Sequence, residues 1–126
     1  MQRFFIIVVL ILAVGVSTTS YAHDRPSVCP SRQWCGCWLA SYLGIHNHKQ
    51  WRDLWVARNW TKYGHPVSGP APGVIAVFAR GKGGHVGIVT SVPRHGVVVL
   101  KSGNDNGTVR ERERSTNGVI AWRSPG

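Results

Sequence analysis

The sequence predicts an α+β fold, with helices in the first half of the chain and an antiparallel sheet of about five strands in the second half. Apolar residues recur at helical spacing up to residue 60, whereas from residue 74 they form short runs between tight turns. Helices followed by a succession of strands are typical of α+β domains. The chain has 126 residues, which is enough for one domain with one core but too few for two.

Residues 1–22 have the features of a secretory signal peptide. Arg3 supplies the positive start, residues 4–16 are apolar, and a small-x-small cleavage pattern ends at Ala22. The apolar run of 13 residues is shorter than the roughly 20 residues that a membrane-spanning helix needs. We therefore expect an exported protein, secreted or periplasmic, whose mature part, residues 23–126, is a single monomeric domain without a membrane span.

The mature part is strongly basic. Cleavage after residue 22 removes one arginine and leaves 14 Lys and Arg against 5 Asp and Glu. Such an excess of positive charge indicates an anionic partner or environment. For an exported protein, cell-wall polymer, lipid headgroups and nucleic acid all fit, and the composition does not choose among them.

Cys35 begins a short apolar stretch that we predict to be a helix ending near Gly44. Ser31, in the turn before it, is a candidate N-cap. A thiol at a helix N-terminus lies beside unpaired N–H groups and the positive end of the helix dipole, which favour the thiolate. The same N–H groups can stabilise an oxyanion. Alternatively, Cys35 is a small buried side chain or half of a disulfide.

Three cysteines, Cys29, Cys35 and Cys37, lie within nine residues. In the oxidising compartment that export implies, an odd number leaves one thiol unpaired or linked to another molecule. A Cys29–Cys37 bridge would leave Cys35 free, whereas a Cys29–Cys35 bridge would inactivate a site at Cys35. A Cys35–Cys37 bridge would close a strained small ring.

A second helix is predicted over residues 50–60, where Trp51 and Trp55 share one face. Tryptophans at this spacing are more typical of a core than of a ligand platform. Just before this helix, His46 and His48 lie in a loop with no carboxylate nearby. We therefore expect neither a metal site nor another cofactor.

Five short strands follow a glycine- and proline-rich loop, at residues 74–79, 85–92, 97–101, 108–115 and 119–123. The tight turns between them indicate an antiparallel meander. In the fourth strand, Arg110, Arg112 and Arg114 alternate with Glu111 and Glu113, which is typical of an exposed strand at a sheet edge. The arginine row either grips an anionic substrate or forms a solvated face with cross-strand ion pairs.

His85 opens an apolar strand directly after a glycine-rich turn, which leaves room for another group to approach its ring. A cysteine nucleophile needs an imidazole that accepts the thiol proton and later protonates the leaving amine. It also needs a third polar group that orients the imidazole. In a meander, the start of one strand lies beside the end of the next, which puts Asn104, or its neighbour Asp105, near His85. The sequence therefore predicts a triad of Cys35, His85 and Asn104.

Four motifs occur in a fixed order between residues 33 and 122. They are a helix-opening cysteine, a Pro-x-Pro-Gly-x-Ile-x-Val-Phe strand, Gly-His-Val-Gly-Ile-Val, and Ser-Gly-Asn. In this order they resemble the NlpC-type/CHAP superfamily of papain-like cysteine peptidases and amidases. Many of these enzymes cut the peptide part of bacterial peptidoglycan. The resemblance implies a papain-like fold.

The resemblance also implies residue roles. Cys35 matches the family nucleophile, His85 matches the base, and Asn104 matches the asparagine that CHAP-like members often use as the third member. Two features depart from the family pattern. Val74 stands where members commonly have an acidic residue, and Cys37 is an additional cysteine, whose place further into the helix argues against its being the nucleophile.

We therefore predict an exported cysteine hydrolase that cuts an amide bond in peptidoglycan or its stem peptides. Trp34, Arg110 and Arg112 are candidate substrate-binding residues. One alternative is a catalytically silent wall- or glycan-binding module of the same fold, using exposed tryptophans such as Trp34 or Trp122. The other is a nucleic-acid-binding or membrane-active protein, which the leader and the apolar strands disfavour, so we expect no specific nucleic-acid partner.

Overall fold

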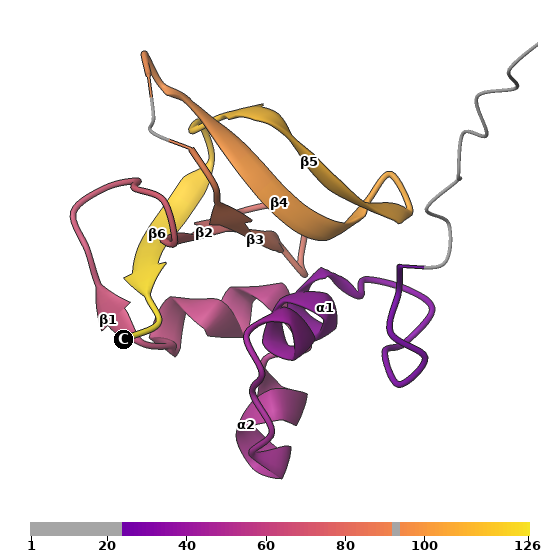
Figure 1. Ribbon diagram of the computed structural model, residues 1–126. Coiled ribbons are helices and arrows are strands. Elements are labelled where there is room, and N and C mark those ends of the chain that lie inside the picture. The colour runs from indigo at the N-terminus through magenta and orange to yellow at the C-terminus, as the bar shows by residue number, and fades with distance from the viewer. Residues whose placement is uncertain (1–23, 92–93) are drawn as a thin grey trace, which may run out of the picture.

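The computed structural model describes residues 24–91 and 94–126, so the predicted leader lies outside the described residues. Two of the three helices, at residues 35–42 and 57–62, pack against a six-stranded antiparallel sheet, and the third, at residues 48–53, packs on the first (Figure 1). This arrangement confirms the α+β prediction. None of the helices in the described part is long and apolar enough to cross a membrane. The elements are α1 (Cys35–Tyr42), α2 (His48–Asp53), the 3-10 helix η1 (Ala57–Lys62), β1 (His65–Pro66), β2 (Ile75–Phe78), β3 (His85–Val89), β4 (Val97–Asp105), β5 (Thr108–Ser115) and β6 (Val119–Ser124).

The strand order in the sheet is β1-β6-β2-β3-β4-β5. Strands β2 to β5 form the predicted meander, and the charged strand β5 lies at the sheet edge as predicted. The meander prediction is wrong for the last strand, because β6 returns to pair with β2. In this position Trp122 lies opposite Ala76 and packs on a buried apolar cluster, which an extension of the meander beyond β5 would not reach.

The sheet is buried on both faces around β2, β3 and β4. One cluster packs between the helices and the sheet, and its largest fully buried members are Trp60, Leu39, Ile75, Val77 and Val86. The second covers the opposite face and contains Ala76, Phe78, Val89, Val98 and Leu100. Since successive strand residues point to opposite faces, β3 places Val86 and Ile88 toward the helices. His85 and Gly87 then share the other face with Val89.

The helix predicted over residues 50–60 is broken in the structure: α2 ends at Asp53 and η1 begins at Ala57. The side-chain amide of Asn59 donates to the Asp53 carbonyl at 2.6 Å, and the Trp60 indole N–H donates to the Leu54 carbonyl at 2.8 Å. These donors satisfy carbonyl groups that a continuous helix would pair internally. With its indole N–H bonded to the Leu54 carbonyl, Trp60 is completely buried in the helix-side core.

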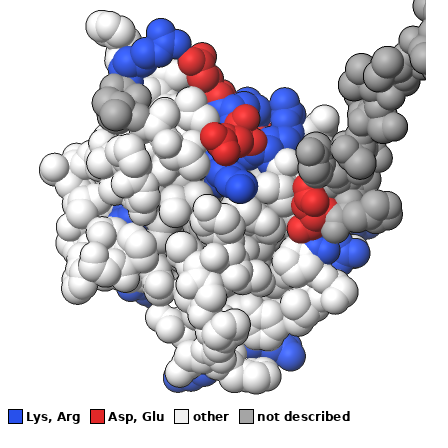
Figure 2. Space-filling model, viewed as in Figure 1, with Lys and Arg blue, Asp and Glu red and all other residues white. Residues whose placement is uncertain are grey.

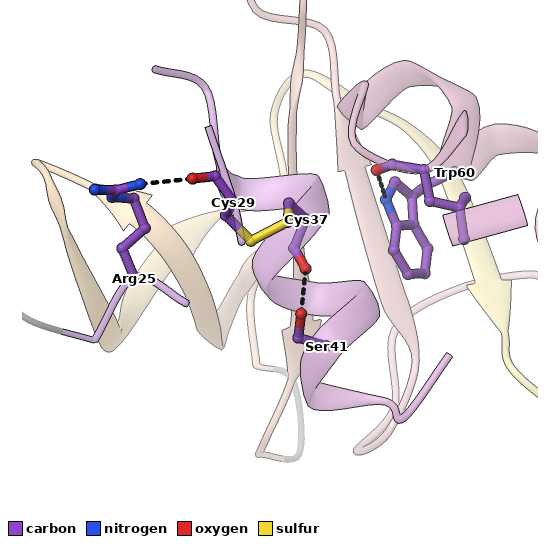
Figure 3. The surroundings of a disulfide bond; sticks show 6 residues. Arg25, Cys29, Cys37, Ser41 and Trp60 are labelled. Carbon is purple, nitrogen blue, oxygen red and sulfur yellow. Dashed lines mark hydrogen bonds between the residues drawn. A yellow bond between two sulfur atoms is a disulfide. The ribbon is translucent and has the colours of Figure 1, made fainter. Parts of the chain in front are cut away.

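A disulfide joins Cys29 to Cys37 across a Cα–Cα distance of 5.7 Å (Figure 3). It is one of the pairings that the sequence left open, and it leaves Cys35 as the free cysteine. Arg25 donates to the Cys29 carbonyl at 2.5 Å, and the Ser41 hydroxyl donates to the Cys37 carbonyl at 3.0 Å. The bridge therefore ties the segment that precedes α1 to the first turn of this helix.

Replacing Cys29 and Cys37 together with alanine should lower the free energy of unfolding by about 2–3 kcal/mol. This magnitude is the loop-closure entropy expected for a short disulfide loop. The measurement is urea unfolding followed by tryptophan fluorescence, without reductant, against the wild-type chain. An unchanged unfolding free energy would show that the bridge does not constrain the unfolded chain.

Candidate active site

Helix α1 begins at Cys35 itself, with no side chain capping its N-terminus. The N-cap position belongs to Trp34, so the expectation that Ser31 caps this helix is wrong. The first N–H with a helical partner is that of Trp38, which donates to the Trp34 carbonyl at 2.9 Å. The N–H groups of the first turn before Trp38 therefore have no partner within the helix, and an oxyanion beside Cys35 can accept hydrogen bonds from them.

The residue after the cysteine must be glycine, because the start of α1 presses against the end of α2. A Cβ atom on Gly36 would lie 2.2 Å from the Leu54 carbonyl oxygen and 2.8 Å from that of Trp55. Both neighbours are backbone atoms and cannot rotate away. The Cys-Gly-Cys sequence thus combines a thiol at the helix start, a close backbone contact, and a disulfide anchor one residue later.

The Cys35 side chain is buried, with 4 % of the residue exposed. Burial raises the pKa of its thiol above the ordinary value. Backbone hydrogen bonds from Val86, Gly36 and Cys35 itself, and the positive charge of Arg80, only partly oppose this shift. The position of Cys35 at a helix terminus predicts that the thiolate is favoured. In the folded chain desolvation outweighs that effect, so the resting form of Cys35 is the thiol.

His85 is the first residue of β3 and is 3 % exposed. Burial lowers its pKa to about 4, and the positive charge of Arg114 adds to this effect. The imidazole is therefore neutral at physiological pH. A neutral imidazole has one free nitrogen that can accept a proton, as a general base requires.

The imidazole Nε2 of His85 lies 3.0 Å from the Ser102 hydroxyl oxygen, and both groups are buried. Lys101 lies opposite Ile88 in the β3–β4 ladder, so Ser102 lies opposite Gly87, on the same sheet face as His85. Gly87 has no room for a side chain, because a Cβ there would be 2.8 Å from Leu100 and from the Lys101 carbonyl.

Asn104, expected as the third member of the triad, has a different position. A regular ladder would place Asn104 opposite His85, but the β4–β5 register shifts between Ser102 and Asp105, and Asn104 has a left-handed backbone with φ 52°. Asn104 lines the same cavity as His85, yet the imidazole hydrogen bond is to Ser102. Ser102 is not among the predicted site residues, although its place two residues before Asn104 puts it on the same face of a regular strand.

Asp105, the alternative third member, is engaged by arginine. The guanidinium of Arg112 donates to its two carboxylate oxygens at 2.5 and 3.0 Å, and Arg110 lies 3.9 Å from it. Burial alone would raise the pKa of Asp105, but these arginines and Arg114 hold it below its ordinary value. Figure 2 shows acidic side chains beside Lys and Arg over β4 and β5. Arg112 thus forms a cross-strand ion pair. Of the two interpretations offered for the arginine row, substrate binding and cross-strand ion pairs, this is the second.

A cavity of about 560 Å³ brings Cys35 and His85 together. Its lining residues are Gln33, Cys35, Arg80, Gly81, Lys82, Gly83, Gly84, His85, Asn104, Asn106 and Gly107. Arg110 and Arg112 are not among them. Trp34 is expected from the sequence to be exposed, but only 4 % of the residue is exposed. Its ring packs against Gly103, where an added Cβ atom would lie 2.9 Å from the ring. The described structure therefore unites Cys35, His85 and Asn104, but not the predicted substrate-binding residues.

The sequence profile of the CHAP domain matches residues 19–104, about two-thirds of the chain. The match includes Cys35, His85, Ser102 and most of the cavity wall, and it ends before β5. No curated protein matches the chain.

Proposed function

We propose that the chain, which belongs to the CHAP family, is an exported cysteine hydrolase. Members of this family are typically hydrolases acting on peptidoglycan. The proposed reaction is the cleavage of an amide bond in the peptide part of this polymer. The observation that carries the proposal is the shared cavity of Cys35 and His85 at the uncapped start of α1. A thiol, a neutral imidazole and free backbone N–H groups are the components of acyl transfer through a thioester.

In the first half of the reaction, the Cys35 sulfur attacks the carbonyl carbon of the amide while its proton passes to His85. The contact between Nε2 and Ser102 leaves Nδ1 of the ring to accept this proton. The carbonyl oxygen becomes an oxyanion, which the N–H groups at the start of α1 stabilise. The tetrahedral adduct then expels the amine, which takes the proton from His85 and leaves a thioester on Cys35.

In the second half, water replaces the amine. His85, neutral again, accepts a proton from the water as the oxygen attacks the thioester carbonyl. Collapse of this second adduct releases the carboxylic acid and returns the proton to the Cys35 sulfur. Because the resting pair is a thiol and a neutral imidazole, the cycle ends in the protonation state in which it began.

We assign Ser102 as the residue that positions the imidazole. Its hydroxyl accepts a hydrogen bond from Nε2–H, which keeps the lone pair on Nδ1. Asn104 lines the cavity and would contact substrate instead.

Ser102→Ala should lower kcat by about 10- to 100-fold with a smaller change in KM, since the orientation of the base is lost while the cavity remains. Asn104→Ala should change KM more than kcat. Both variants are measured by initial rates of amine release, and circular dichroism checks that they fold. A loss of kcat in Asn104→Ala alone would make Asn104 the third member of the triad.

The test of the proposed function uses purified mature protein and purified peptidoglycan. Amide hydrolysis creates new amino groups and no new reducing sugar ends, so both are counted over time. New amino groups that are absent with Cys35→Ser support the proposal. Binding of the protein to the wall without either product would instead support the wall-binding module.

A further inference from the structure

The charged side chains that line the active-site cavity are both positive. Arg80 and Lys82 belong to the turn between β2 and β3, and no Asp or Glu of the described residues lines the cavity. Both side chains are exposed, and neither forms an ion pair within residues 24–91 and 94–126. The nearby carboxylate of Asp105 is already paired with Arg112. The cavity therefore presents two positive charges that the described protein leaves uncompensated.

The turn that carries these charges is anchored to the fold. Arg58 donates to the Gly81 carbonyl at 2.7 Å, and the Gly84 N–H donates to the Arg80 carbonyl at 2.8 Å. Gly84 has φ 72°, and a Cβ there would lie 2.8 Å from the Phe78 carbonyl oxygen. Because the backbone of the turn is held on both sides, Arg80 and Lys82 extend from a defined wall of the cavity.

Arg80 and Lys82 line the same cavity as Cys35 and His85. Burial is the main cause of the pKa shifts of Cys35 and His85, and the charge of Arg80 contributes at both groups. An anionic group held by Arg80 would thus lie in the same cavity as the bond that Cys35 attacks. Arginine offers a planar pair of donors to a carboxylate, and lysine offers a compact point charge.

We propose that the substrate of this site is a peptide with a free carboxylate beside the amide that is cut, and that Arg80 and Lys82 bind this carboxylate. The inference rests on the proposed function, since it assigns the substrate class of the same cavity. Peptidoglycan stem peptides in which that carboxylate is blocked as a carboxamide are then poor substrates. The competing explanation for the two positive charges is that they attract any polyanion to the cavity, such as a phosphate-rich wall polymer.

The test removes the charge from each partner in turn. Soluble stem-peptide fragments are prepared from purified peptidoglycan with a muramidase, and half are treated with carbodiimide and ammonia to convert carboxylates into carboxamides. The enzymes are wild type, the double variant Arg80→Gln/Lys82→Gln, and a matched control, Arg52→Gln/Lys49→Gln. The control removes the same charge from exposed positions outside the cavity.

For wild type and the control variant, we expect kcat/KM to be about tenfold higher with the free carboxylates, as for one charge-assisted contact. For the Arg80→Gln/Lys82→Gln variant, both fragment forms should be cut at similar rates. Equal wild-type rates on both forms would overturn the inference and leave the proposed function standing. An equal slowing of both forms by both variants would also overturn it, in favour of general attraction. If wild type cuts neither form, the proposed function itself is wrong.

Discussion

Replacing Cys35 with serine should reduce amine release from peptidoglycan by about a thousandfold or more. A hydroxyl is much harder to deprotonate than a thiol, and the available base is weak because burial lowers the pKa of His85 to about 4. An imidazole of this pKa can assist a thiol but transfers a proton from a serine hydroxyl poorly. The measurement is the initial rate of amino-group release at neutral pH.

The control for this prediction is the variant in which Cys29 and Cys37 are both alanine. Their sulfur atoms are joined in the disulfide, so the variant should retain hydrolysis under conditions where it remains folded. Cys35→Ser leaves that disulfide in place and should unfold at nearly the wild-type urea concentration. Wild-type rates from Cys35→Ser would rule out this cysteine as the nucleophile.

Replacing His85 with glutamine should reduce kcat by about a thousandfold, within the range observed when a general acid–base is removed. Glutamine is polar and similar in size, but it cannot accept and return the proton. Since burial keeps the Cys35 thiol protonated, no preformed thiolate can compensate. Alkylation of Cys35 by iodoacetamide at neutral pH should slow in the same variant. His46→Gln, at an exposed histidine, is the matched control.

The pH dependence of the wild type follows from the same histidine. His85 must be neutral to accept the thiol proton, so kcat/KM should be constant from neutral pH to about pH 5 and fall as the pH drops through about 4. The residual activity of His85→Gln should lack this decrease. A decrease centred near the ordinary histidine pKa of about 6.5 would mean that the imidazole is not desolvated in the working enzyme.

The position of Cys35 and His85 in one cavity could be predicted because the signals for both residues are local. Cys35 precedes an apolar helical stretch, and His85 follows a glycine-rich turn and opens an apolar strand, so each position is visible in a few neighbouring residues. The meander from β2 to β4 then brings His85 toward the end of β4. Asn104 as the third member stays a prediction, because counting along a regular ladder ignores the register shift between Ser102 and Asp105, and the hydrogen bond of the imidazole is to Ser102.

The substrate-binding residues expected from sequence show that the type of a residue does not by itself predict whether its side chain faces the cavity. Trp34 and the arginine row have side chains that often bind ligands, yet Trp34 is buried against β4 and Arg112 is paired with Asp105. Arg80 and Lys82, in a glycine-rich turn without any recognisable motif, line the cavity instead. Which charged side chains face a site depends on the path of the turns around it.

By itself the sequence determined the α+β order of elements, the edge placement of β5, and the two side chains that we propose carry the chemistry, whereas it left the pairing of the three cysteines open. These features follow from periodicity, turn residues and spacing, which act over a few residues. Only the tertiary structure decided the return of β6 to β2, the contact between Ser102 and His85, and the direction of the pKa shifts. Each of these depends on packing and desolvation between segments far apart in the chain, where a single bulge or a buried ring changes the outcome.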